Sequence, residues 1–262
     1  RTALHIATGR GDARSIRVLL AHHANVGTLD PAGDPPLAIA AAIGRAECVD
    51  ALLAGGADPN QPNGRNGLRP LDAAVLFGAP ETLERLLRAG ADPNAPNARG
   101  ETALHHAATL DSARSLLVAD VLLGHGANPA ARDVRGFTPL HVAASRDNVA
   151  VVRFYLDRKL ELNTPSAWGQ TPFDVAMAYG ADFAADALFE GGARSLMMSP
   201  SPPLFEASRT NDVSRLLRLL AAGVDREESL AGKTARDIAR ESGSEDALRL
   251  LGPSRSASDA KH

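Results

Sequence analysis

The sequence predicts an all-α solenoid in which short helix pairs stack and turn-rich loops project between them. Three observations predict this fold class. A unit returns about every 33 residues; each unit holds two segments of helical apolar spacing separated by a break; and no segment shows a long alternation of apolar and polar residues. A unit of this length cannot bury its apolar side alone, so stacked neighbours must bury it together.

The first helix of each unit begins with a tetrad similar to Thr-Pro-Leu-His. The third residue of the tetrad recurs at Leu4, Leu37, Leu71, Leu104, Leu140, Phe173 and Leu204, and in a degenerate last copy at Arg236. We therefore expect a single array over residues 1–252, followed by a disordered tail over 253–262. Its approximate repeats are 1–32, 33–66, 67–99, 100–135, 136–168, 169–199, 200–231 and 232–252, the last being a C-terminal cap.

The unit from Gly136 to Lys159 shows why each segment is helical. Thr138 supplies an N-cap hydroxyl, and Pro139 occupies the first helical position, where a missing N–H costs nothing. Asp147-Asn148 breaks this slim helix before a bulkier second one. Small residues at the middle of the first helices allow neighbouring units to approach closely, at Ala40-Ala41, Ala73-Ala74, Ala107-Ala108 and Ala143-Ala144.

The second helix ends at a glycine in most units, and a turn-rich segment with a second glycine follows. Such a glycine closes the last turn in the left-handed conformation, whereas His23 and Lys159 replace it in two units. The Asn, Asp and Gly residues that follow favour a projecting hairpin.

Three departures from the pattern predict local differences. The unit beginning at Thr102 has three extra residues between Asp111 and Gly126, which lengthen its interhelical loop or its second helix. The Pro-rich junction at 192–203 lacks the second glycine, which predicts a hinge, a changed stacking angle or a rigid irregular loop instead of a regular hairpin. Charged residues in 233–251, with Arg236 in the core position, indicate a polar cap.

These motifs resemble those of the ankyrin repeat family. Thr-Ala-Leu-His-Ile-Ala at 2–7 and Thr-Pro-Leu-His-Val-Ala at 138–143 are similar to the family's first-helix signature, and Leu-Leu-Ala-Gly-Gly-Ala-Asp-Pro-Asn at 52–60 to its second-helix exit. The resemblance covers nearly the whole chain. It implies a curved stack of antiparallel helix pairs, with hairpins projecting at about right angles and a concave face that binds other proteins.

Composition limits the function classes. The net charge is −3, from 28 basic and 31 acidic residues, which gives no general case for binding nucleic acid or a membrane surface. No apolar run is long enough to span a bilayer. The single cysteine, Cys48, excludes an internal disulfide framework and fits an intracellular, cytoplasmic protein, although a fragment of an exported or membrane-associated protein would look the same. The chain starts without Met, so we expect a fragment of a longer protein or a trimmed form.

No motif for catalysis, cofactor binding or metal binding is present. Phosphate-binding loops, calcium loops and nucleophile turns are all missing, so we expect no enzyme activity, no cofactor and no metal. His5, His105 and His141 share one position of the unit with Asp72, Asp174 and Asp237. Three residues after a capping Thr, such a side chain can hydrogen-bond back to the helix start, and we interpret all six as structural.

The resemblance implies that partners contact the ends of the first helices and the residues that flank the hairpin glycine. Aromatic residues and arginine are frequent at these positions, and both types anchor interfaces. Packing between repeats is the alternative for four residues at these positions: Leu76, Phe77, Leu110 and Trp168. The candidate partner-binding residues are Arg65, Asn66, Leu68, Phe77, Arg99, Glu101, Leu110, Val134, Arg135, Phe137, Arg146, Trp168, Gln170 and Tyr179.

Two hypotheses for function follow. The first is a non-catalytic scaffold, a monomer that binds a protein or peptide carrying acidic groups beside an apolar anchor. The second is a regulatory or targeting module of a larger enzyme, channel or secreted effector whose catalytic part lies outside this chain.

Overall fold

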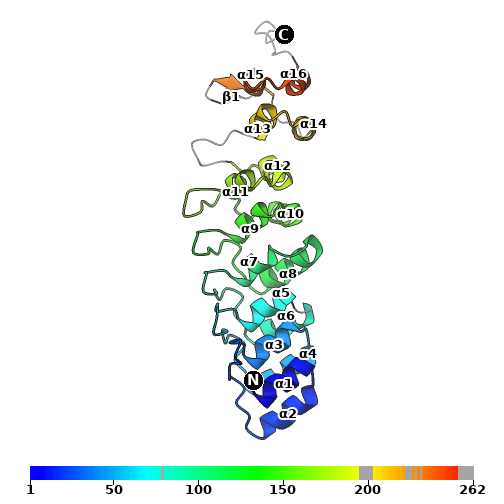
Figure 1. The fold of residues 1–262 in the computed structure, drawn as a ribbon, viewed down its shortest axis with the longest axis vertical. Helices are drawn as coiled ribbons and strands as arrows, with labels where there is room; N and C mark the ends of the chain where they lie inside the picture. Colours follow the sequence, from blue (N-terminus) through cyan, green and yellow to red (C-terminus); the bar gives the residue numbers. More distant parts are fainter. Residues whose placement is uncertain (78–79, 195–202, 222–225, 228, 231, 253–262) are drawn as a thin grey trace.

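The chain folds as stacked helix–turn–helix pairs along one axis (Figure 1). The computed structural model describes residues 1–77, 80–194, 203–221, 226–227, 229–230 and 232–252. The first helices form an inner layer beside the projecting turns: α1 (Ala3–Arg10), α3 (Pro36–Ala42), α5 (Pro70–Phe77), α7 (Ala103–Ala107), α9 (Pro139–Ser145), α11 (Pro172–Tyr179), α13 (Pro203–Arg209) and α15 (Ala235–Glu241).

The second helices form an outer layer: α2 (Ala13–Ala21), α4 (Ala46–Ala54), α6 (Pro80–Arg88), α8 (Ser112–Gly124), α10 (Val149–Asp157), α12 (Asp182–Glu190), α14 (Val213–Ala221) and α16 (Glu245–Leu251). Only one pair of strands, β1 (Ser229–Leu230) and β2 (Lys233–Thr234), occurs among the described residues. The prediction of an all-α solenoid is confirmed.

Small side chains set the spacing of the inner layer. Ala40 and Ala41 of α3 and Ala143 and Ala144 of α9 are completely buried, because these two helices pack against the inner helices before and after them. Larger side chains at these positions would push the helices apart, which a close-packed interior does not tolerate.

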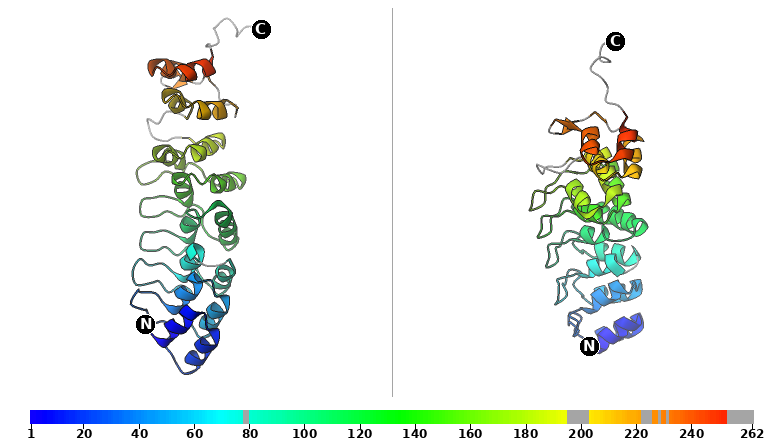
Figure 2. Two further views of the ribbon diagram at one scale, coloured as in Figure 1. Left: turned by 45° about the vertical axis from the view of Figure 1, so that its right-hand side comes forward. Right: turned by 45° about the horizontal axis from the view of Figure 1, so that its top comes forward.

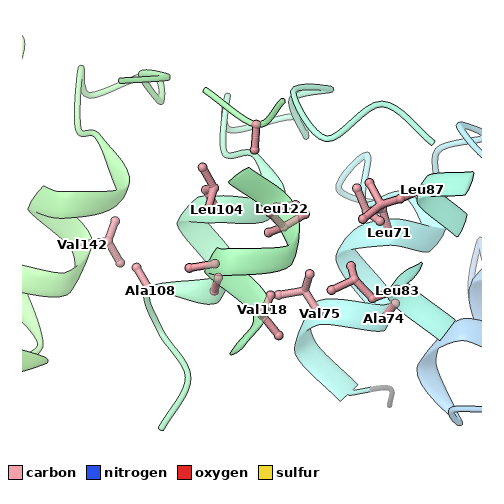
Figure 3. Close-up of a cluster of buried hydrophobic side chains, with 14 of the residues drawn as sticks. Leu71, Ala74, Val75, Leu83, Leu87, Leu104, Ala108, Val118, Leu122 and Val142 are labelled. Carbon is pink, nitrogen blue, oxygen red and sulfur yellow. The ribbon is translucent and has the colours of Figure 1, made fainter. Parts of the chain in front are cut away.

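The bulky part of the core lies between the two layers. Leu71 and Val75 of α5 lie near Leu83 of α6, and Val118 and Leu122 of α8 continue the cluster into the next pair (Figure 3). Each repeat thus completes the apolar surface of its neighbour, as the period predicts.

A ladder of backbone hydrogen bonds connects the projecting turns. The amide of Gly64 donates to the carbonyl of Gly33 (2.7 Å), and the same bond recurs from Ala98 to Asn66, from Val134 to Arg99 and from Ala167 to Arg135, each at 2.9 Å. The turns therefore lie in a row on one side of the stack (Figure 2).

Gly136 shows why this approach requires glycine. Its φ is +73°, and a Cβ atom there would lie 2.6 Å from the amide nitrogen of Ala167. Neither the left-handed backbone nor the close contact suits a larger residue.

The three extra residues of the fourth unit lie in the outer layer. Helix α8 has 13 residues, whereas α6 and α10 each have nine. Of the two expected places for the insertion, the second helix is the observed one, and the ladder of turns continues past it without a gap.

The apolar core has two parts among the described residues. One cluster extends from Leu4 to Ala193, and a second from Leu204 to Leu251. Between them, the buried Arg215 of α14 donates from Nη1 to Asp182 Oδ1 (2.6 Å) and from Nε to Asp186 Oδ1 (3.3 Å) in α12. A polar contact thus takes part in the junction at which the sequence predicts an irregular connection; most of that connection, 195–202, lies outside the described residues.

The last pair ends with a polar cap. The Arg236 guanidinium, at the usual leucine position, donates to the carbonyl oxygens of Leu248 (3.3 Å) and Gly252. A cation at this place satisfies carbonyl groups at the end of α16 and complements its dipole. The predicted tail at 253–262 lies outside the described residues.

Replacing Arg215 by Ala should loosen the C-terminal helix pairs selectively. The change leaves two carboxylates at the junction without their cation, a loss of about 3 kcal/mol for a buried ion pair. Hydrogen exchange should show faster exchange in α13–α16 than in wild type, and unchanged exchange in α5–α8. The exposed pair of Arg209 and Glu206 provides the control, since Arg209→Ala should cost about 0.5 kcal/mol. Equal protection in both variants would contradict the role of Arg215.

Candidate functional site

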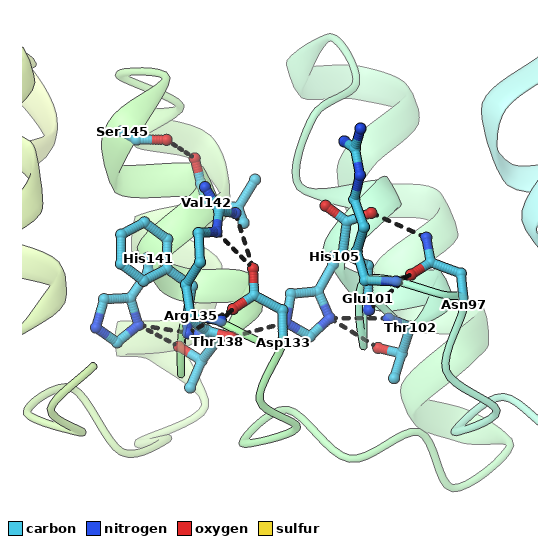
Figure 4. Close-up of polar contacts among 12 residues, drawn as sticks. Asn97, Glu101, Thr102, His105, Asp133, Arg135, Thr138, His141, Val142 and Ser145 are labelled. Carbon is cyan, nitrogen blue, oxygen red and sulfur yellow. Dashed lines mark hydrogen bonds and ion pairs between the residues drawn. The ribbon is translucent and has the colours of Figure 1, made fainter. Parts of the chain in front are cut away.

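Buried or half-buried polar residues shape the projecting turns. The Asp133 carboxylate accepts hydrogen bonds from the amides of Arg135 (2.8 Å) and Phe137 (2.9 Å) (Figure 4). The same position holds Asp30, Asn63, Asn97 and Ser166, whose side chains also accept amide hydrogen bonds within their own turns. The turns are thus held in one conformation, and residues at their tips project from a rigid support.

The repeated histidines connect three inner helices, α1, α7 and α9, to the turns that follow them. The Nδ1 atoms of His105 and His141 accept from the amides of Thr102 (3.1 Å) and Thr138 (3.0 Å). Their Nε2 atoms donate to the carbonyls of Phe137 (2.9 Å) and Gln170 (3.0 Å). The structural interpretation of these histidines is confirmed, and so is the capping box of Asp174 and Asp237.

Burial keeps these two histidines neutral near pH 7. It lowers the pKa of His141 to about 4, against the opposing hydrogen bond to Gln170, and it also lowers the pKa of His105. Their ring nitrogens are already used within the fold, which leaves no nitrogen for a ligand.

Four large candidate side chains are exposed on the inner layer and turn tips. Phe77 is 69% exposed, Val134 72%, Trp168 61% and Tyr179 65%. Arg65, Asn66, Arg99 and Arg146 are exposed as well, whereas Leu68, Glu101, Leu110, Arg135 and Gln170 are half-buried. The structure therefore places these candidates on one side of the stack; we call this surface the inner face.

The expectation that Phe137 is exposed is wrong, because its side chain is only 4% exposed. The ring stacks on His141 (centroids 5.1 Å apart), and Trp168 meets it edge-on (6.0 Å). The Arg135 guanidinium lies over the Phe137 ring, 4.5 Å from the ring centroid. Phe137 thus packs beneath two candidates, the exposed Trp168 and the half-buried Arg135. Its position next to a hairpin glycine did not indicate that His141 would cover its ring.

Leu110 is also turned partly inward, where it packs against the main apolar cluster. This arrangement agrees with the alternative that the sequence left open for that residue. Packing between repeats was also the alternative for Phe77, but its side chain is exposed.

Candidate residues line two hollows in the described part of the inner face. A groove of about 200 Å³ between α3 and α5 is mainly apolar and is lined by Ile39, Ile43, Leu68, Ala73 and Phe77. A second hollow of about 360 Å³ spans α7, α9 and α11, and we call it the basic pocket; its lining includes Glu101, His106, Thr109, Arg135, Arg146 and Tyr179. Sequence reasoning did not select Ile39 or Ala73, which have the helical spacing of core residues and become accessible only because neighbouring side chains are small.

The inner face carries unpaired arginines. Arg65, Arg99 and Arg146 are exposed and form no ion pair among the described residues, whereas Arg135 pairs with Asp133. The outer layer holds ion pairs, such as Asp50 with Arg85, and also exposed arginines with no ion pair among the described residues, such as Arg153. An acidic molecule would therefore find unpaired cations on the inner face, although not only there.

Asp72 is a buried carboxyl group on the same face, between α5 and α7. It accepts from the amide of Arg69 (2.8 Å), and its Oδ1 lies 3.8 Å from Nε2 of His106. Burial raises the pKa of Asp72 to about 7, with Glu101 adding to the rise and the Arg69 amide opposing it. Burial also lowers the pKa of His106, so near pH 7 neither group is a fixed charge.

Other site classes find little support in the described part of the chain. It contains no group of three or more His, Cys, Asp or Glu residues placed to hold a metal ion. None of its helices has both the length and the apolar character needed to cross a membrane.

The chain is similar to known proteins through its repeats. The family model described as ankyrin repeats (three copies) matches residues 1–63, 39–133, 71–165 and 112–199. The E3 ubiquitin-protein ligase KEG of Arabidopsis thaliana is 42% identical over 59 residues, which make up 22% of this chain and 4% of that protein. Ankyrin repeat and MYND domain-containing protein 1 of Mus musculus is 45% identical over 67 residues, or 24% of this chain and 7% of that protein. The matched segments are thus small parts of both relatives.

Replacing Phe137 by Ala should destabilise the fold. A buried phenylalanine contributes about 3 kcal/mol, well above the effect of an exposed tip residue. The free energy of unfolding in urea measures the loss. Val134→Ala on the same turn is the matched control and should change stability by at most about 0.5 kcal/mol. If the two variants unfold alike, the support assigned to Phe137 is wrong.

Replacing Asp72 by Asn should make stability less sensitive to pH. A folded carboxyl with a pKa of about 7, against 3.8 ordinarily, binds more protons than the unfolded chain between these values, so its contribution to stability falls as pH rises through this interval. The free energy of unfolding of Asp72→Asn relative to wild type should increase by about 2 kcal/mol from about pH 5 to about pH 8. A constant difference across this range would contradict the raised pKa.

Proposed function

Since the chain belongs to the ankyrin repeat family, whose repeats are generally protein–protein interaction modules, we propose that it is a scaffold that binds a partner protein or peptide through its inner face. The observation that carries this proposal is the exposure of Phe77, Trp168 and Tyr179 on the surface that also holds unpaired arginines. Large aromatic side chains beside arginine are typical of interface anchors.

The proposed scaffold has no catalytic activity of its own. The ankyrin repeat is generally a non-catalytic interaction fold, and the titratable side chains of the inner layer, such as His105 and His141, are used in helix caps. We place a single array over residues 1–252, acting as a monomer. An intracellular, cytoplasmic setting is supported by the single cysteine, Cys48, which is buried as a free thiol.

The second hypothesis, a targeting or regulatory module of a larger protein, is favoured by one observation. The similar segments make up only 4% and 7% of the two relatives. In such a protein the array would bind the partner, and another domain would act on it. Sequencing the complete open reading frame distinguishes this arrangement from an independent scaffold.

The combined change Trp168→Ala and Tyr179→Ala should abolish partner capture while the array remains folded. A buried aromatic anchor contributes about 2 kcal/mol, close to thirtyfold in affinity, whereas losing the edge contact of Trp168 with Phe137 should cost about 1 kcal/mol of stability. Affinity capture from cells that express the chain, followed by mass spectrometry, gives the set of bound proteins.

The matched control combines Val18→Ala and Leu117→Ala. These side chains, 53% and 50% exposed, lie on the outer layer. The control variant should retain the partners that the inner-face variant loses. Identical sets from both variants would contradict binding through the inner face.

A further inference from the structure

We propose that the basic pocket binds a single Asp or Glu side chain of a linear partner segment. This inference rests on the proposed function, because it names the partner group that the inner face selects. The pocket lies where α7, α9 and α11 approach the turn at 133–137, and its donors and acceptors are arranged as one acidic peptide residue requires.

Arg135 is already held in a binding conformation. Asp133 accepts from its Nε (2.9 Å) and lies 2.8 Å from its Nη2, while the Phe137 ring lies beneath the guanidinium at 4.5 Å. These contacts leave Nη1 without a partner among the described residues. A guanidinium fixed before binding loses little side-chain entropy when it meets a carboxylate.

Arg146 and Tyr179 supply the other donors. Arg146 is exposed and forms no ion pair among the described residues, and Tyr179 is 65% exposed. Both side chains reach the same hollow as Arg135. A carboxylate entering the pocket can therefore accept hydrogen bonds from two guanidinium groups and one phenol, and such charge-assisted bonds are the stronger kind.

The wall of the pocket also holds acceptors. The Ser145 hydroxyl donates to the carbonyl of Val142 (2.8 Å), and the Thr109 hydroxyl donates to that of His106 (2.8 Å). Their protons are thus used within the helices, which leaves the hydroxyl oxygens of these two lining residues as acceptors. A backbone amide of a bound peptide can donate a hydrogen bond to one of these hydroxyl oxygens. A small carboxylic acid that is not part of a peptide has no such amide.

Charge favours a carboxylate over a phosphate group. Arg135 and Arg146 bring two positive charges to the pocket, and Glu101 and the Asp133 carboxylate that pairs with Arg135 bring two negative charges. His105 and His106 add none, because burial lowers the pKa of both. A bound carboxylate therefore adds one negative charge next to Glu101, whereas a phosphate dianion would add two.

A random peptide library displayed on phage provides the probe. Peptides selected on the wild-type array should share an Asp or Glu, and their affinities should be measured with purified peptide by isothermal titration calorimetry. Arg146→Glu should weaken them roughly tenfold or more. Arg153→Glu is the matched control: Arg153 is exposed on α10, outside the pocket, and its change should leave affinity within about twofold.

A double-mutant cycle then tests the contact itself. The acidic residue of the peptide is changed to Gln or Asn and combined with Arg146→Ala, whose fold is checked by circular dichroism. The two losses should not add, since both remove the same interaction. Additive losses, or selected peptides without an acidic residue, would overturn the carboxylate site while leaving a peptide-binding scaffold intact.

Two further outcomes would overturn the proposed carboxylate site. Tighter binding after the acidic residue is replaced by phosphoserine would overturn the assignment of a single carboxylate. A library that yields no peptide at all would overturn the site for linear segments, and only the capture experiment on Trp168 and Tyr179 would then bear on the scaffold.

Discussion

Close approach of successive repeats is the constraint on which the rest of this structure depends. Buried alanines such as Ala40 and Ala143 bring the inner helices together, and amide-to-carbonyl bonds such as Gly64 to Gly33 (2.7 Å) bring the turns together at the same period. Because both contacts act between nearest neighbours, each repeat from α1 to α11 positions the next one. Over these repeats the inner face is therefore one continuous surface, although residues of several repeats compose it.

The sequence period was sufficient to predict the fold, and the local chemistry of caps and glycines was sufficient to predict most helix ends. Thr138 and Pro139 begin α9 as expected, and the glycine positions have the predicted left-handed backbone. The junction contact of Arg215 with Asp182 and Asp186 was not predicted. Its partners lie about one repeat away, and nothing in the period shows that a charged side chain in an outer helix will be buried there.

The candidate site was predicted only in part, because the repeat position of a residue does not show which side chains of the neighbouring repeats it contacts. Repeat position correctly indicated that Phe77, Trp168 and Tyr179 would be exposed. It failed for Phe137, since the burial of that ring depends on which side chains occupy the neighbouring repeats, His141 and Trp168 in this case. Whether those exposed residues bind a partner stays a prediction. Which arginines form ion pairs was not predicted either, because the partners in pairs such as Arg85 with Asp50 and Arg158 with Asp120 lie about one repeat apart.

The extended helix α8 has a meaning for how such a chain can change over generations. Its extra length, 13 residues against nine in its neighbours, is accommodated on the side away from the turns, and Val134 still donates to Arg99 in the adjoining turns (2.9 Å). Residues can thus be inserted in the outer helices without changing how the inner helices and turns stack. The surface offered to a partner is shielded from length mutations, and it can evolve by single substitutions while the outer layer grows or shrinks.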